Sequence, residues 1–268
     1  MSRAGVPRRA DAREIARVYG LHAFILCFIT VMLVADGVLQ DLGPQLAIGV
    51  ITFGVLFVCA RRIEPRQRLQ LGLCVLLSTG FEAIGSLVWG GYRYRLHNIP
   101  LYVPPGHALV YLFGITAAAL PLMVRHGRRV RLAVLSACSA WALAGVTVLP
   151  LLTGRLDVQG ALLLPLFAWC ILRSGRGDLF AAVWVATATV EIVGTWAGDW
   201  AWGATAPWTR IPSGNPPSTI AAGYAVIDGS VVLLAPLASL VLQRLSTSRP
   251  ARVLQGERTS AAAGASRS

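Results

Sequence analysis

Two glutamates, Glu82 and Glu191, lie inside strongly apolar segments of a 268-residue chain, where an ionisable side chain is costly. Each begins a series of residues that occurs twice. The first copy reads Glu82-Ala-Ile-Gly85-Ser86, then Tyr92-Arg-Tyr94, then Val103-Pro104-Pro-Gly106-His107. The second copy reads Glu191-Ile-Val-Gly194-Thr195, then Trp200-Ala-Trp202, then Ile211-Pro212-Ser-Gly214-Asn215. The copies are 109 residues apart at the glutamates and 108 apart from the aromatic pair onward.

These residue types suggest acid chemistry in a dry environment. A carboxylic acid in an aromatic, water-poor pocket can stay neutral and donate a proton. Asp228, well inside the last apolar segment, is a third acid of this kind. The sequence therefore predicts catalytic roles for Glu82, Glu191 and Asp228. The residues predicted to bind substrate lie near these acids and are Trp89, Tyr92, Tyr94, His107, Trp196, Asp199, Trp200, Trp202 and Asn215.

Small residues follow each glutamate on the same helical face, three and four positions later. They are Gly85 and Ser86 in the first copy, Gly194 and Thr195 in the second. Small residues allow another helix to approach closely, and the hydroxyl can form a hydrogen bond. Both glutamates are therefore predicted to face the protein interior.

The segments after the two glutamates are rich in aromatic residues and prolines. Proline stiffens a loop and suits the first turn of the next helix. We therefore expect two ordered loops that cover the acids, with Gly106-His107 and Gly214-Asn215 at or near the starts of the following helices.

Composition places these motifs in a membrane protein. The chain is 55% hydrophobic and 13% charged, with a mean hydropathy of +0.63, whereas about 25% of a soluble domain is charged. The net charge of +12 comes from arginine alone, since the chain has no lysine. The arginines form short clusters between apolar runs, which favours membrane orientation over nucleic-acid binding.

No cofactor or metal is predicted. The five cysteines lie in apolar runs without a CxxC pair, which is typical of buried small side chains. No HxxxH or HxxE spacing supports a metal site made by the two glutamates with His97 and His107, and no nucleotide-binding motif is present.

Eight apolar segments are long enough to be predicted as membrane spans. Their approximate ranges are 19–40, 43–60, 68–90, 105–124, 130–152, 157–173, 178–197 and 217–243. With a cytoplasmic N-terminus, 20 arginines fall on the cytoplasmic side and only four on the other. The positive-inside rule then predicts a multi-pass protein of the cell membrane with both termini in the cytoplasm.

The fold class predicted is an all-α bundle of eight transmembrane helices, built as two parallel four-helix repeats. The domains are a basic head (1–18), a first repeat (19–124), a second repeat (125–243) and a disordered cytoplasmic tail (244–268). The two copies of the motif have the same orientation because an even number of spans separates them, so the repeats are related by an axis near the membrane normal. The partners predicted are the lipid bilayer and a lipophilic small molecule, and the oligomeric state is left open.

The motif resembles a pattern of membrane carotenoid hydratases of the bacterioruberin type. The resemblance covers about 30 residues per copy and consists of Glu-x-x-Gly, the Tyr92-Arg-Tyr94 pair and the later Val103-Pro104. The chain is also similar, more loosely, to membrane-embedded terpene cyclases, which use acids on separate helices. These resemblances imply acid-catalysed hydration or cyclisation of an isoprenoid-type substrate. The spacing from Glu82 to Tyr92 is shorter than in the hydratases.

Two other functions fit the same residues. Parallel halves with intramembrane acids suit a proton-coupled transporter or flippase of a small or amphipathic solute. Alternatively, the protein is a non-catalytic membrane assembly or lipid-binding protein, in which the glutamates only join helices by hydrogen bonds and the aromatic residues form the interfacial belt.

Overall fold

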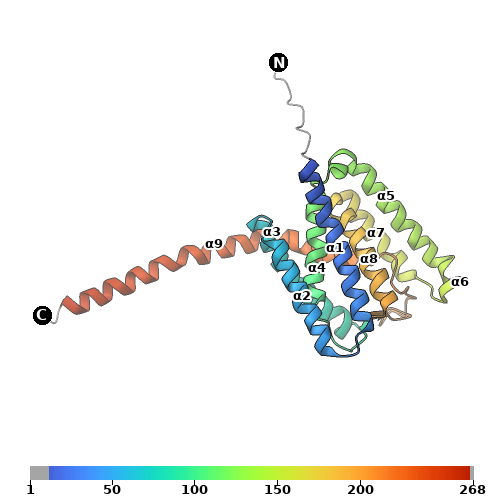
Figure 1. Cartoon of the computed structure of the whole chain (residues 1–268), viewed down its shortest axis with the longest axis horizontal. Coiled ribbons are helices and arrows are strands. Elements are labelled where there is room, and N and C mark those ends of the chain that lie inside the picture. Colours follow the sequence, from blue (N-terminus) through green and yellow to red (C-terminus); the bar gives the residue numbers. More distant parts are fainter. Residues whose placement is uncertain (1–11, 266–268) are drawn as a thin grey trace, which may run out of the picture.

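The computed structural model describes residues 12–265, and the side chains of residues 19–245. The chain folds into a helix bundle in which the long helices that follow one another along the chain run in opposite directions (Figure 1). The helices are α1 (Ala12–Val38), α2 (Leu42–Ala60), α3 (Pro65–Glu82), the π-helix η1 (Ala83–Val88), α4 (Val103–Ala117), α5 (Pro121–Val146), α6 (Leu149–Thr153), α7 (Val158–Arg173), α8 (Gly177–Ala197) and α9 (Ala221–Ala265).

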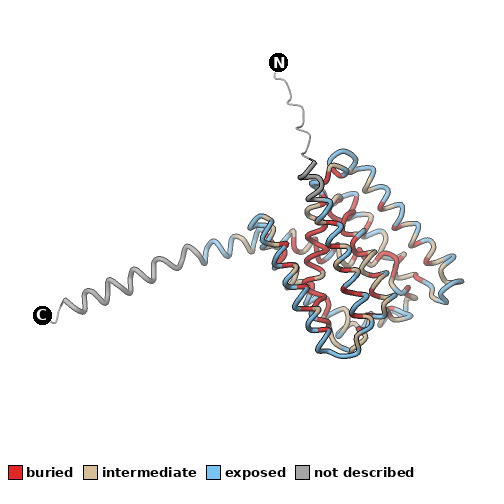
Figure 2. Tube along the Cα trace, in the orientation of Figure 1, coloured by how far each residue is buried: buried red, intermediate tan, exposed pale blue. Residues whose placement is uncertain are grey.

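The outer surface of the bundle is apolar, as a lipid-facing surface must be. Figure 2 shows the buried residues in the centre and exposed residues along the outer helices. Many exposed side chains on the described spans are large and hydrophobic, among them Val31, Val50, Leu76, Val124 and Leu233. This distribution supports an all-α, multi-pass membrane bundle.

Each of the eight apolar segments contains a helix, but only six of the described helices are long and apolar enough to cross a membrane. The exceptions are α4 and α7, with 15 and 16 residues. Twelve of the 15 residues of α4 are buried, so this helix lies in the middle of the bundle. It packs against α8, where a Cβ added at Gly114 would lie 2.6 Å from side-chain atoms of Leu179 and Val183.

Several boundaries differ from those predicted. The span expected at 105–124 ends at Ala117, and α5 begins already at Pro121. The arginine-containing connection between the spans expected at 105–124 and 130–152 is therefore part of α5, with a kink at His126. Arginine favours helix, so a run of arginines does not by itself mark a loop.

The two ends of the chain also differ from expectation. Residues 12–18 of the predicted head belong to α1, and residues 1–11 lie outside the described residues. The tail predicted to be disordered continues α9 as far as Ala265. Its alanines and arginines are strong helix formers, and residues 266–268 are outside the described part.

A short two-stranded ribbon joins the loops that follow the two glutamates. Strand β1 (Tyr92–Tyr94) pairs antiparallel with β2 (Trp200–Trp202). Tyr92 lies opposite Trp202 and Tyr94 opposite Trp200, so the centre of the ribbon is the pair of Arg93 and Ala201. The ribbon places both loops at the same end of the bundle.

The difference between the offsets of 109 and 108 residues has a structural cause. The first copy has one more residue than the second between its glutamate and its aromatic pair. In the structure this residue is accommodated by the π-helix Ala83–Val88, where the second copy continues as the regular helix α8. A π-helix widens the turn by one residue and occurs frequently at functional sites. Both helices then end at a left-handed glycine, Gly90 or Gly198.

The loop before α9 is fixed to the start of α7 by one buried carboxylate. The Asp157 Oδ1 accepts hydrogen bonds from the backbone N–H of Gly160 at 3.0 Å and of Gly214 at 2.9 Å. Its Oδ2 accepts one from the N–H of Ser218 at 2.7 Å. Asp157 is 3% exposed, so water cannot replace it as an acceptor.

We expect Asp157→Ala to lower the free energy of unfolding by about 3 kcal/mol, because it leaves three buried N–H groups without an acceptor. Chemical unfolding of the purified protein in one detergent measures this loss. Asp41→Ala is the matched control, since Asp41 also precedes a helix but its side chain makes no capping bond there. Equal stability of the two variants would contradict the role of Asp157.

Candidate functional site

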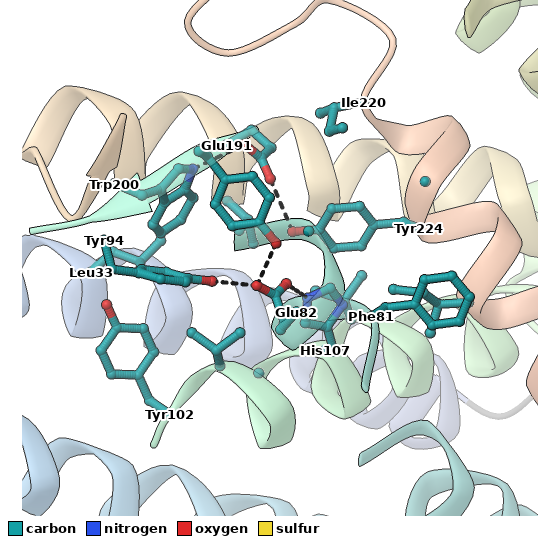
Figure 3. A pocket seen from close by; sticks show the side chains of 18 of the residues that line it. Leu33, Phe81, Glu82, Tyr94, Tyr102, His107, Glu191, Trp200, Ile220 and Tyr224 are labelled. Carbon is teal, nitrogen blue, oxygen red and sulfur yellow. Dashed lines mark hydrogen bonds and ion pairs between the residues drawn. The ribbon is translucent and has the colours of Figure 1, made fainter. Parts of the chain in front are cut away.

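Both glutamates line one cavity of about 240 Å³ at the ribbon end of the bundle. Its walls come from α1, α3, α4, α8, α9 and the two strands. Figure 3 shows Glu82 and Glu191 in this cavity with aromatic side chains around them. The expectation that the two acids face a shared interior therefore agrees with the geometry.

Glu82, at the end of α3, accepts three hydrogen bonds from side chains. Its Oε2 accepts from the hydroxyls of Tyr92 and Tyr94, both at 2.6 Å. Its Oε1 lies 2.9 Å from the Nε2 of His107, in the first turns of α4. Because β1 alternates its side chains, the two tyrosines of Tyr-x-Tyr point to the same side, toward the carboxylate.

Glu191, in α8, has a matching set of donors. Its Oε2 accepts hydrogen bonds from the indole N–H of Trp200 at 3.2 Å and of Trp202 at 3.1 Å. Its Oε1 accepts from the hydroxyl of Tyr224 at 3.1 Å. Each glutamate is thus held by the two rings of its own strand and by one residue of the next long helix.

The motif glycines make room for these rings. A Cβ added at Gly194 would lie 2.0 Å from the Trp200 ring, and one at Gly85 would lie 2.9 Å from the Tyr92 hydroxyl. The predicted reason for the glycines was close approach of another helix, but the approaching groups are the aromatic rings of the following strand. The hydroxyls of Ser86 and Thr195 donate to the backbone carbonyls of the glutamates, at 2.7 and 2.6 Å.

The third partners of the two glutamates contact each other. The rings of His107 and Tyr224 stack with centroids 4.6 Å apart and an angle of 23°. Figure 3 shows Tyr224 between His107 and Glu191. The two acids are therefore linked across the cavity by one hydrogen bond on each side and the ring contact between His107 and Tyr224.

The prediction for Gly214-Asn215 was wrong, whereas Gly106-His107 lies near the start of α4 as expected. α9 begins only at Ala221, because the second loop is longer. Asn215 does not line the cavity. Its Oδ1 instead accepts a hydrogen bond from the backbone N–H of Trp202 at 2.9 Å and so supports the strand.

The two glutamates differ in the charge of their surroundings. Burial, and then the negative charge of Glu82, raises the pKa of Tyr92, and the same two causes raise the pKa of Tyr94. Both phenols therefore stay neutral donors. Glu82 has in addition an imidazole that can carry a positive charge, whereas all three partners of Glu191 are neutral.

The other predicted residues occupy different places. Trp89, together with the four residues of the two aromatic pairs, lines the cavity. Trp196 is 77% exposed on the outside of α8, and Asp199 and Asp228 are buried but do not line the cavity. Among the side chains of residues 19–245, no three His, Cys, Asp or Glu residues are placed to hold a metal ion.

A second acidic pair lies beside the cavity, at the ends of α1 and α8. Asp36 accepts hydrogen bonds from the Gln45 amide at 3.0 Å and the Tyr102 hydroxyl at 2.9 Å, and Arg95 lies 3.4 Å from its Oδ2. Asp199 is within hydrogen-bond range of Asp36. Neither oxygen of the Asp199 side chain has a donor among the described residues. Two carboxylates cannot bond to each other unless one carries a proton.

Two residues of the site were not predicted from the sequence. Tyr224 is the third partner of Glu191 and lies outside both copies of the motif. Tyr102, a cavity residue, also binds Asp36. Helical spacing could have identified Tyr224 from the sequence, because Tyr224 lies four residues, or one turn, before the predicted Asp228 and on the same helical face.

No protein-family model, curated protein or solved structure significantly matches this chain. The function must therefore be inferred from the geometry of the site. Two buried acids that face one aromatic cavity, with different donors, could give and take a proton.

We expect Gly194→Ala to destabilise the protein by about 1–3 kcal/mol, because the new methyl group displaces the Trp200 ring. Thermal unfolding and tryptophan fluorescence measure the loss. Gly80→Ala, on α3, is the control, since nothing lies within 4 Å of the added methyl group. It should raise stability slightly, because alanine favours helix. Equal unfolding temperatures for the two variants would contradict the ring contact.

The Asp36–Asp199 pair predicts a dependence of stability on pH. Burial, and then the charge of Asp36, raises the pKa of Asp199 from 3.8 to about 8. Because the pKa is higher in the folded protein than in the unfolded chain, the stability it contributes decreases as pH rises from about 4 to about 8.

Asp199→Asn, which stays neutral, should flatten this decrease, as measured by thermal unfolding between about pH 4 and pH 9. Asp178→Asn removes a half-exposed carboxylate that pairs with Arg131, and it should keep the wild-type dependence on pH in this range. If the unfolding temperatures of the wild type and Asp199→Asn change equally with pH, a proton shared between Asp36 and Asp199 is ruled out.

Proposed function

We propose that the protein is a membrane enzyme that adds a proton to a carbon–carbon double bond of a lipophilic, isoprenoid-type substrate and directs its hydration or cyclisation. The observation that supports this proposal is the pair of buried glutamates at one aromatic cavity, one held by an imidazole and two phenols, the other only by neutral donors. Paired acids in different environments are the usual arrangement for an acid and a base in one site.

In the proposed reaction, Glu191 is the acid. An ionised carboxylate without a cation nearby is costly in an apolar bundle, which favours the neutral acid at Glu191. The double bond supplies the electron pair that forms the new C–H bond, and Glu191 becomes a carboxylate. The positive charge remains on the other carbon of the former double bond.

Glu82 is the base in this scheme. In hydration, the oxygen of a water molecule forms a bond to the cationic carbon and then loses a proton to Glu82. In cyclisation, the electron pair of a second double bond forms the ring bond to the cationic carbon, which leaves the positive charge on a new carbon. A C–H bond next to that carbon then breaks, its electrons form a double bond, and its proton goes to Glu82. The His107 imidazole at 2.9 Å stabilises the carboxylate form of Glu82 before this step.

The aromatic rings of the cavity suit the cationic intermediate. Trp89, Tyr92, Tyr94, Trp200 and Trp202 all line it. A cation near an aromatic face is stabilised by about 0.5–2 kcal/mol per ring. Since the four rings of the two strands also donate hydrogen bonds to the glutamates, these four are held in place before the substrate enters.

The size of the cavity limits how much of the substrate it can hold. A volume of about 240 Å³ is below the range of about 300–1,000 Å³ that is usual for drug-sized ligands. We infer that the reacting end of an isoprenoid chain occupies the cavity and that the remainder lies among the helices or in the lipid.

We also propose eight membrane crossings, two parallel four-helix halves and an extracytoplasmic site. The arrangement of arginines, 20 on one side and four on the other, supports this topology. The central position of α4 supports a crossing by a short helix, since neighbouring helices separate it from lipid. The matched partners of the two glutamates and the antiparallel pairing of their strands support the two-fold relation.

The test uses membranes that contain the full chain, incubated with a panel of isoprenoid alkenes. Products heavier by one water, or cyclic isomers of equal mass, are expected from the wild type. Glu191→Gln removes the acid and should lower the rate about 10²–10⁴-fold, the usual contribution of general acid catalysis. Glu82→Gln should also slow the reaction, whereas the exposed Glu64→Gln should not.

Product formation at the wild-type rate by folded Glu191→Gln and Glu82→Gln would refute the proposed roles. A solute that accumulates in proteoliposomes under a pH gradient, without chemical change, would favour the transporter instead. Folding of each variant is checked by size-exclusion chromatography in the same detergent.

A further inference from the structure

A second layer of polar side chains lies one helical turn deeper in the bundle than the cavity. Each of the four helices that hold the glutamates and their third partners contributes one such residue. They are Ser78, four residues before Glu82; Tyr111, four after His107; Thr187, four before Glu191; and Asp228, four after Tyr224.

All four residues lie on the side of the cavity that faces away from the ribbon. Helices α3 and α8 run toward the ribbon, so four residues earlier is deeper, and α4 and α9 run away from it, so four residues later is deeper. Four residues correspond to about 6 Å along a helix and return to the same face. The four side chains are almost fully buried, with at most 3% exposed.

Three of these residues have a polar atom without a partner among the described residues. These atoms are the Tyr111 hydroxyl, the Thr187 hydroxyl and the Asp228 Oδ2. The contrast with neighbouring hydroxyls is clear, because Thr195 and Thr189 on the same helix donate to the carbonyl four residues earlier. Thr187 makes no such bond, and buried polar groups in proteins are normally satisfied.

The packing of α4, α8 and α9 places the turns that carry these three residues next to one another. Tyr111 lies within electrostatic range of Asp228, of Cys74 and of the Arg176 guanidinium, and Cys74 lies within range of Asp228. On α4, Gly114 packs against Leu179 and Val183 of α8, and the antiparallel course of these helices brings Tyr111 toward the turn that contains Thr187. None of the three ion pairs formed by the described residues includes Asp228.

We propose that Asp228, Tyr111 and Thr187 form a second site, separate from the cavity, that binds one water molecule beside a neutral Asp228. A carboxylic acid and two hydroxyls offer three hydrogen bonds, the number that a buried water usually makes. A neutral acid avoids the cost of an unpaired charge in the apolar interior. The site lies one turn below the stacked His107 and Tyr224, so it would provide a reserve of water and protons beneath the acids of the cavity.

Infrared spectroscopy of the purified protein tests this site without reference to any reaction. We expect a C=O band of a neutral carboxylic acid in the wild type that is lost in Asp228→Asn and retained in Asp178→Asn. We also expect an O–H band that shifts in ¹⁸O-labelled water. It should be lost in Tyr111→Phe and Thr187→Val but retained in Thr189→Val, which changes a half-buried residue whose hydroxyl already donates to a backbone carbonyl, and in Tyr19→Phe, which changes an exposed residue.

If Asp228→Asn does not fold, Tyr111→Phe and Thr187→Val decide the outcome. Each removes a single oxygen, and each should shift the C=O band of Asp228. An unchanged C=O band in Asp228→Asn, or in both hydroxyl variants, would overturn the proposal. So would a sodium-dependent carboxylate band at Asp228, which would indicate a cation in place of the proton.

Discussion

Two carboxyl groups inside an apolar helix bundle need hydrogen-bond donors, and most of the architecture around them follows from that requirement. The backbone N–H groups of α3 and α8 are already used within these helices, so the donors must come from side chains elsewhere. The chain supplies two from a short strand just after each glutamate and one from the next long helix. The glycine three residues after each glutamate then keeps the helix surface open for the first ring.

The same requirement is met in two chemically different ways. Tyrosine hydroxyls and an imidazole surround Glu82, and indole N–H groups with one hydroxyl surround Glu191. Phenols, indoles and an imidazole are similar in shape but differ in the charge they can carry. The two copies of the motif therefore give two acids of different character around one cavity.

The sequence predicted the features that depend on local pattern. The doubled motif, the interior position of both glutamates and the apolar helices follow from residue spacing and hydropathy, and His107 was found because it ends the first copy. The ribbon was not predicted, because the alternation of side chains over only three residues cannot be distinguished from the sequence of a loop. Tyr224 was missed because its contact with Glu191 depends on the length of the second loop, which shifts α9 relative to the motif. The boundary between α4 and α5 was misplaced because arginines were taken to mark a turn.

The ribbon of β1 and β2 also bears on how the molecule can move. It connects the two loops by backbone hydrogen bonds, and the bonds from Arg95 N–H to the Asp199 carbonyl and from Gly203 N–H to the Gly91 carbonyl lengthen this connection. The two loops cannot separate at this end without breaking all of these bonds. Alternating access by rocking of one half against the other would require both ends to open in turn. The ribbon restrains this end of the bundle. While its hydrogen bonds are intact, the helices can move apart only at the opposite end or sideways, toward the lipid.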